Sequence, residues 1–169
     1  MSWHIAQLNV ALPLEPLDSA RLADFVAALD PVNALADAAD GFVWRLQSEG
    51  GDATDIRGAD DQIIINMSVW TSLAALRDFV FGGAHVQVMR RRREWFVPMR
   101  DAYTVLWWVP AGDLPDVAEA ERRLDLLRRI GPSAEAFTFK VPFPAPDGVD
   151  PEPDGMIGSD RSPATCGVD

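Results

Sequence analysis

The order of strand-like and helix-like segments is the feature that most limits what this 169-residue chain can fold into. Residues 2–10 alternate in polarity, as a half-buried strand does. Residues 42–48, 62–70 and 102–109 are rich in β-branched and aromatic residues and predict three more strands. Helical patterns follow the first and the third strand. The resulting β-α-β-β-α-β order predicts an α+β fold of the ferredoxin-like type, with an antiparallel sheet.

Capping and breaking residues mark where the first two helices begin and end. Asp18 or Ser19 is expected to cap the first helix, and Pro31 is expected to interrupt it. Residues 31–40 are expected to continue as a separate short helix, which Gly41 ends. Thr71 or Ser72 is expected to cap the second helix. The Gly- and Asp-rich loop over residues 49–61 predicts that the second and third strands form an antiparallel hairpin.

The second helical stretch holds four consecutive arginines, Arg90 to Arg93. It is expected to break at a joint, Gly82-Gly83, and to stop at Pro98. Consecutive helical residues point about 100° apart, so the arginines cannot share one face. We expect most of them to be solvated or paired with acids such as Glu94 or Asp101, and one, Arg92, to point inward.

The C-terminal part changes character twice. Asp116 begins a helix through a D-x-x-E capping pair, and Gly131 ends it. Residues 136–141 are expected to form a short strand or an extended arm. Residues 142–169 are rich in Pro, Gly and Asp and are expected to be disordered or loosely attached. We therefore expect a single domain over residues 1–141.

One face of the predicted sheet is expected to lack a cover, because the two helices of the ferredoxin-like unit lie on the other face. The side chains that we place on the uncovered face are Trp44, Asn66, Ser68, Trp70 and Trp107. They are too apolar to leave in water, so the sequence predicts a homodimer.

Composition excludes several classes of protein. A net charge of −11 disfavours nucleic-acid binding, which requires phosphate neutralisation. No apolar run approaches the roughly 20 residues of a membrane span, and the first residues do not resemble a signal peptide. Cys166, the single cysteine, cannot form an internal disulfide. We expect a cytoplasmic protein without a metal site, because the loop acids Asp52, Asp55, Asp60 and Asp61 do not fit a calcium motif.

Four motifs together resemble a known family. They are S-V-W at 68–70, H-x4-R-R-R-x-x-W-F at 85–96, L-W-W-V-P-x-G at 106–112 and G-P-x3-A-F-T-F at 131–139. The chain resembles the domain of unknown function 3291 family over about residues 1–141. That family is placed with the dimeric α+β barrels, the superfamily of antibiotic biosynthesis monooxygenase-like proteins.

The resemblance implies a dimeric barrel and leaves several activities open. The superfamily includes metal-free monooxygenases of polycyclic aromatic substrates, haem-handling enzymes, isomerases and stress-response proteins. Fold analogy does not choose among them. In the haem-binding relatives a helix histidine is the axial ligand, and His85 lies in a comparable part of the topology. In the monooxygenases an asparagine and a tryptophan act together, and Asn66 with Trp70 is similar to that pair.

His85 is the leading candidate for chemistry. It follows the glycine joint, and helical spacing places it on one face with Met89 and Arg92. A histidine can act as acid, base or ligand near neutral pH, and an arginine can hold an anion. A histidine that only fixes the helix joint through a backbone carbonyl is the structural alternative.

The other candidate residues would form the walls of a cavity. We expect His85, Arg92 and Asn66 to carry catalysis. The expected substrate-binding residues are Trp44, Trp70, Met89, Trp107 and Ser68. For each tryptophan, packing in the core or a dimer interface is the alternative.

Three functions follow from these residues together with what the resemblance implies. The first is a monooxygenase-like enzyme that acts without a cofactor on an apolar or aromatic small molecule. The second is a haem-binding or haem-processing protein with His85 as the axial ligand. The third is a non-catalytic dimeric protein that binds a small molecule or serves in a stress response.

Overall fold

The computed structural model describes residues 1–148 of the chain. Their sheet is antiparallel and has the order β2-β3-β1-β4. Its strands are β1 (Trp3–Ala11), β2 (Phe42–Arg45), β3 (Ile64–Trp70) and β4 (Thr104–Pro110). This order is that of a ferredoxin-like unit and confirms the predicted fold class. The pairing of β2 with β3 also confirms the expected hairpin.

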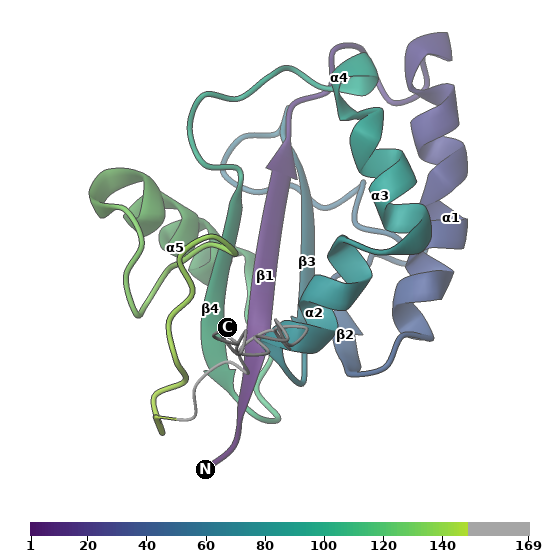
Figure 1. Ribbon diagram of the computed structural model, residues 1–169. Coiled ribbons are helices and arrows are strands. Elements are labelled where there is room, and N and C mark those ends of the chain that lie inside the picture. Colours follow the sequence, from purple (N-terminus) through teal and green to yellow (C-terminus); the bar gives the residue numbers. More distant parts are fainter. Residues whose placement is uncertain (149–169) are drawn as a thin grey trace, which may run out of the picture.

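Helices cover both faces of the sheet (Figure 1). In chain order they are the 3-10 helix η1 (Ala20–Leu22) and the α-helices α1 (Ala23–Asp37), α2 (Leu73–Val80), α3 (Gly83–Arg90), α4 (Arg92–Trp95) and α5 (Val117–Ile130). Figure 1 shows α1 to α4 on one side of the sheet and α5 on the other.

The expected capping residues begin three of these helices. The Ser19 hydroxyl accepts a hydrogen bond from the Leu22 amide at 3.4 Å. Ser72 caps α2 through the Ala75 amide, and Asp116 caps α5 through the Glu119 amide at 2.7 Å. Each cap satisfies an amide at a helix start that has no partner within the helix.

The expected interruption at Pro31 is wrong. Helix α1 runs through Pro31 to Asp37. Proline removes one helical hydrogen bond, but most of a helix's stability comes from packing of its inner face. Here Ala36 is buried, and Val32 and Asn33 face the space between α1 and the sheet. The helical turns on both sides of Pro31 persist, so the helix is continuous where the local signal predicts a break.

The expectation of an uncovered sheet face is also wrong. Ala120, Leu124 and Leu127 of α5 lie in one buried cluster with side chains from β1, β3 and β4. In that cluster Leu8 and Val105 are completely buried within a single chain. A homodimer is therefore not required to cover this face and stays a prediction.

A β-bulge changes which tryptophans share a face. Phe42 lies opposite Trp70, but Trp44 lies opposite Val69, so the register shifts between them. Trp44 consequently packs on the α5 side, and so does Trp107, which pairs with Ala6 and is fully buried. Placing these two tryptophans beside Asn66 and Trp70 was an error. The bulge reverses the alternation in β2 for Trp44, whereas Trp107 pairs with Ala6 and therefore lies on the opposite face from Gln7 and Asn9.

The packed domain continues beyond the expected boundary at residue 141. The Phe143 ring lies 6.0 Å from the Phe137 ring, and the Phe143 carbonyl accepts a hydrogen bond from Trp108 Nε1. Phe137 forms an isolated bridge with Leu106, so residues 136–141 act as the extended arm that was expected. The rest of the expected tail, 149–169 with Cys166, lies outside the described residues.

Candidate functional site

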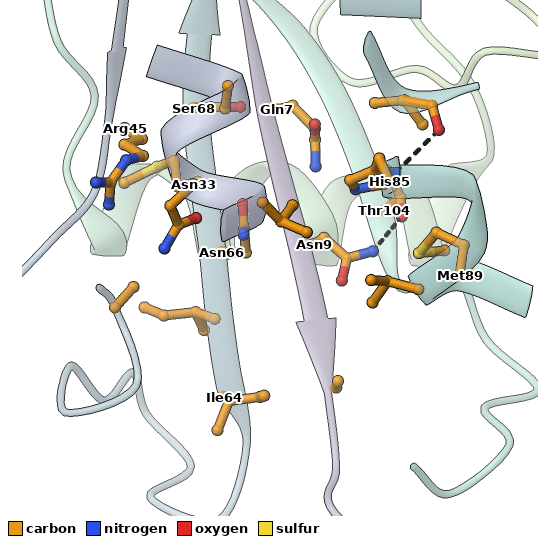
Figure 2. Close-up of a pocket in the computed structure, with 18 of the residues that line it drawn as sticks. Gln7, Asn9, Asn33, Arg45, Ile64, Asn66, Ser68, His85, Met89 and Thr104 are labelled. Atoms are coloured by element: carbon orange, nitrogen blue, oxygen red, sulfur yellow. Dashed lines mark hydrogen bonds between the residues drawn. The ribbon is translucent and has the colours of Figure 1, made fainter. Parts of the chain in front are cut away.

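A cavity of about 560 Å³ lies between the sheet and helices α1, α3 and α4. We call it the sheet–helix cavity. Its volume is within the range of about 300–1,000 Å³ that is usual for small-molecule sites. Figure 2 shows side chains from β1, β3, α1 and α3 around it.

The floor of the cavity is polar. Asn9 of β1 lies opposite Asn66 of β3 and Thr104 of β4, and on the next rung Gln7 lies opposite Ser68. All five line the cavity, and we call them the polar floor. On either side of these rungs the sheet is apolar, with Trp70 at one end and Ile64 at the other.

Parts of the polar floor are paired within the protein. Asn9 Nδ2 donates to Thr104 Oγ1 at 2.8 Å, and Trp70 Nε1 donates to Ser68 Oγ at 2.9 Å (Figure 2 draws the first of these). Within residues 1–148, the side-chain amides of Gln7 and Asn66 form no hydrogen bond. They are therefore available to a molecule in the cavity.

The opposite wall of the cavity is mainly apolar. It is formed by side chains on the inner faces of α1 and α3, namely Phe25, Ala28, Leu29, Val32, Val88 and Met89. Asn33 of α1 adds one amide to this wall. A flat molecule with one polar edge and apolar faces would match a cavity of this kind.

His85 lines the cavity at the start of α3 (Figure 2). Its Nδ1 lies 2.9 Å from the Val80 carbonyl oxygen, and its ring lies 5.2 Å from that of Phe79. A carbonyl can only accept, so Nδ1 carries the proton and Nε2 is left as an acceptor. Burial lowers the pKa of His85, and the bond to Val80 opposes this in part. The imidazole is therefore neutral at pH 7 and can take up a proton.

Arg92 supplies one of the positive charges that line the cavity, with Arg45 and Lys140. Its guanidinium stacks 4.4 Å over the Tyr103 ring and 5.3 Å over the Phe96 ring, and donates to the Val10 carbonyl at 3.0 Å. Burial lowers the pKa of Arg92, but a guanidinium stays charged at neutral pH. Among residues 1–148, no carboxylate pairs with it.

Two other arginines, Arg91 and Arg45, are already paired with carboxylates. Arg91 pairs with Glu94 and Asp24, both at 2.8 Å, as expected for an exposed member of the run. Arg45 lines the cavity but holds both oxygens of Asp37, at 2.7 and 3.2 Å, and the Gly51 carbonyl. Arg92 is therefore the arginine best placed to receive an anion.

The structure brings together six of the eight predicted site residues. They are His85, Arg92, Asn66, Trp70, Met89 and Ser68. Trp44 and Trp107 do not line the cavity, since they pack on the α5 side of the sheet.

The sequence reasoning missed Gln7, Asn9, Asn33 and Thr104 as site residues. Amides at alternate positions of an otherwise apolar strand face were the available signal for Gln7 and Asn9. Asn33 was missed because only the fold brings this part of α1 over the sheet.

Two searches of residues 1–148 gave negative results. No group of three or more His, Cys, Asp or Glu side chains is arranged to hold a metal ion. Within the same residues, no helix is long and apolar enough to cross a lipid bilayer.

Comparisons with solved structures give similarity in fold alone. Rv0793 from Mycobacterium tuberculosis is 15% identical with a TM-score of 0.46, over 67% of this chain and 99% of that one. SnoaB, a cofactor-independent oxygenase from Streptomyces nogalater, is 16% identical with a TM-score of 0.40, over 66% and 95% of the two chains. NE2512, a protein of unknown function from Nitrosomonas europaea, is 17% identical with a TM-score of 0.43, over 68% and 96%.

Sequence comparison gives the family. A comparison with curated proteins gives no match. The family model described as domain of unknown function DUF3291 matches residues 4–152, which is most of the chain. The match confirms the resemblance found in the four motifs. The chain belongs to the DUF3291 family.

Proposed function

We propose that this protein is a small-molecule enzyme of the monooxygenase-like type that acts on a planar, largely aromatic substrate in the sheet–helix cavity. The observation that carries the proposal is the cavity itself. It combines an apolar wall with a neutral histidine, His85, and an arginine without a carboxylate partner in the described chain, Arg92. A neutral base and a fixed cation beside an apolar wall are suited to forming and holding a substrate anion.

In the proposed reaction His85 acts as the base. Its Nε2 takes a proton from a CH₂ or hydroxyl group of the substrate, and Arg92 stabilises the anion that results. A carbanion flanked by aromatic rings is electron-rich and can react with O₂. For a CH₂ group, one oxygen atom becomes the carbonyl oxygen of the product, and the other leaves as water with the two hydrogens.

Oxygen uptake with anthrone as the probe tests this proposal. We expect anthraquinone to form faster than by autoxidation, with one O₂ consumed per anthrone. His85→Asn is the informative variant, because its amide keeps an N–H donor for the Val80 carbonyl but has no basic nitrogen. A rate equal to autoxidation, in a protein that binds anthrone, would favour the non-catalytic alternative.

Haem is the cofactor of the second candidate function. The bond from Nδ1 to Val80 leaves Nε2 of His85 available, as in many metal-ligating histidines. The polar floor fits haem poorly, however. One apolar porphyrin face would cover Gln7 and Asn66 and leave their amides unpaired, at about 1–3 kcal/mol each. We derive no step through haem. If added haem gives a Soret band that His85→Asn abolishes, haem binding becomes the preferred function over the monooxygenase-like one.

We also propose a homodimer, as the family resemblance implies. Because α5 already covers one sheet face, a second copy would use another surface, such as the exposed edge of β2. Sedimentation equilibrium should then give twice the chain mass of 18.5 kDa. A single-chain mass at micromolar concentration would contradict the dimer and leave the cavity unaffected. We propose the cytoplasm as the location, which a fluorescent fusion can test.

A further inference from the structure

Gln7 is a buried amide whose side chain has no partner within residues 1–148. It lies in the middle of β1, is only 9% exposed and lines the sheet–helix cavity. Buried polar side chains nearly always form hydrogen bonds, and each exception requires an explanation. A partner that enters the cavity from outside is the explanation that the position of Gln7 favours.

Two more amides face the same space. Asn66 on β3 and Asn33 on α1 line the cavity with Gln7, and within the described chain neither side chain forms a hydrogen bond (Figure 2). Gln7 is the buried member of the three, whereas Asn33 is half-buried and Asn66 is exposed. A purely apolar ligand would displace water from the Gln7 amide and replace none of its hydrogen bonds.

The strand register fixes the spacing of these groups. Asn66 lies directly opposite Asn9, and Gln7 is one rung along the sheet from both. Directly opposite side chains are about 4.5–5.5 Å apart, and neighbours on one face of a strand about 7 Å apart. The side chains of Gln7 and Asn66, on neighbouring strands, can therefore converge from two sides on one polar edge of a planar molecule.

We infer that the substrate is a planar aromatic molecule with a carbonyl acceptor beside an N–H or O–H donor on the edge that faces the sheet, and that Gln7 and Asn66 recognise this edge. A side-chain amide offers a donor and an acceptor side by side, so it pairs in a bidentate manner with a complementary edge. This inference rests on the proposed function and narrows its substrate class. Unsubstituted hydrocarbons become poor ligands.

Two probes of the same shape isolate the polar edge. Phenanthridinone is a tricyclic lactam with adjacent C=O and N–H groups, and phenanthrene is the matched hydrocarbon. The measured quantity is the ratio of their Kd values, obtained by fluorescence titration of the full chain. Comparing this ratio between variants removes the intrinsic difference in hydrophobicity between the probes.

Gln7→Met and Asn66→Leu remove the amides at nearly constant volume. Gln7→Met should shift the ratio about tenfold toward phenanthrene, as expected for a lost hydrogen-bonding group in a buried site. Asn66→Leu should shift it in the same direction but less, because Asn66 is exposed. Gln87→Met is the matched control, since Gln87 is exposed on α3 and does not line the cavity. It should leave the ratio unchanged.

Thermal unfolding separates recognition from support of the fold. Because Gln7 has no partner within the described chain, Gln7→Met should keep or raise the Tm. A lower Tm with weaker binding of both probes would assign Gln7 a structural role and count against the inference.

Two binding outcomes distinguish the inference from the proposed function. If both probes bind and neither variant changes the ratio, the inference is overturned and the ligand-binding cavity stands. If neither probe binds at its solubility limit, the proposed ligand site falls, and the inference falls with it.

Discussion

At the residue scale, function and stability make opposite demands on the sheet–helix cavity. An apolar side chain at Gln7 would pack against its neighbours without any unpaired amide. His85 similarly loses hydration where an exposed histidine would not, and burial lowers its pKa as a result. Residues that cost stability in this way are expected at sites that bind or react.

The pH dependence of stability should show the burial of His85. The pKa of His85 in the folded protein is below the ordinary value of 6.5, so the folded state is favoured when this imidazole is neutral. This contribution to the free energy of unfolding is fully present above pH 6.5. As the pH falls, the unfolded chain takes up this proton first, and the stabilisation is lost progressively through the folded-state pKa. Urea unfolding at pH 7.5 and pH 5 should therefore show a larger loss for wild type than for His85→Asn. Equal losses would contradict the burial of a neutral imidazole.

The charge of Arg92 should govern the binding of anionic ligands. Arg92→Met keeps an apolar stem against Tyr103 and Phe96 but removes the guanidinium. A hydrogen bond to a charged group contributes about 1.5–3 kcal/mol, so anthracene carboxylate should bind about ten- to hundredfold more weakly. Anthracene itself should be little affected. Arg93→Met is the control for net charge, because Arg93 is exposed, and an equal effect there would assign the change to long-range electrostatics.

At the element scale, α5 has the clearest structural role. It covers the sheet face opposite the cavity, and its inner side chains Ala120, Leu124 and Leu127 are at most 5% exposed. By completing the core within one chain, α5 allows the other sheet face to carry the polar floor. The division between a structural face and a binding face follows from the alternation of side chains along each strand.

Two substitutions within α5 test that role. Leu124→Ala should lower the free energy of unfolding by about 2–5 kcal/mol, as is usual for a buried leucine. Ile130, in the last turn of the same helix, is 65% exposed, and Ile130→Ala should have a much smaller effect. Urea unfolding of both variants measures the difference. Similar small losses would mean that α5 does not seal the sheet.

Local sequence signals predicted the elements better than the contacts between them. Alternation and caps placed the four strands and the starts of α2 and α5, because these depend on neighbouring residues alone. The same reasoning failed at Pro31 and at the bulge before Trp44. Helix α1 runs through the proline without a break, and the extra residue in β2 exists only relative to β3. Neither feature is visible in a short window of sequence.

The same distinction holds for the candidate site: local spacing predicted some of its residues, and only the fold revealed the others. His85, Met89 and Arg92 were grouped by helical spacing, and all three line the cavity. Asn33 joined them only through the fold, which brings α1 over the sheet. The amides of β1 were visible in the sequence, but nothing local distinguished a cavity from a packed interface.

At the scale of the whole molecule, the account depends on where a ligand binds. The fold offers a cavity on one side of the sheet and a filled core on the other. The protein has a net charge of −11, yet basic side chains that include Arg92 line the cavity. Small anionic or polar aromatic molecules match this arrangement better than nucleic acid does.

Mapping amide chemical shifts by NMR during a titration with phenanthridinone tests the central claim most directly. The account predicts shifts at Gln7, Asn66 and the inner faces of α1 and α3, with α5 unaffected. Shifts that cluster on α5, or on the exposed edge of β2, would place the ligand elsewhere and contradict the proposed site.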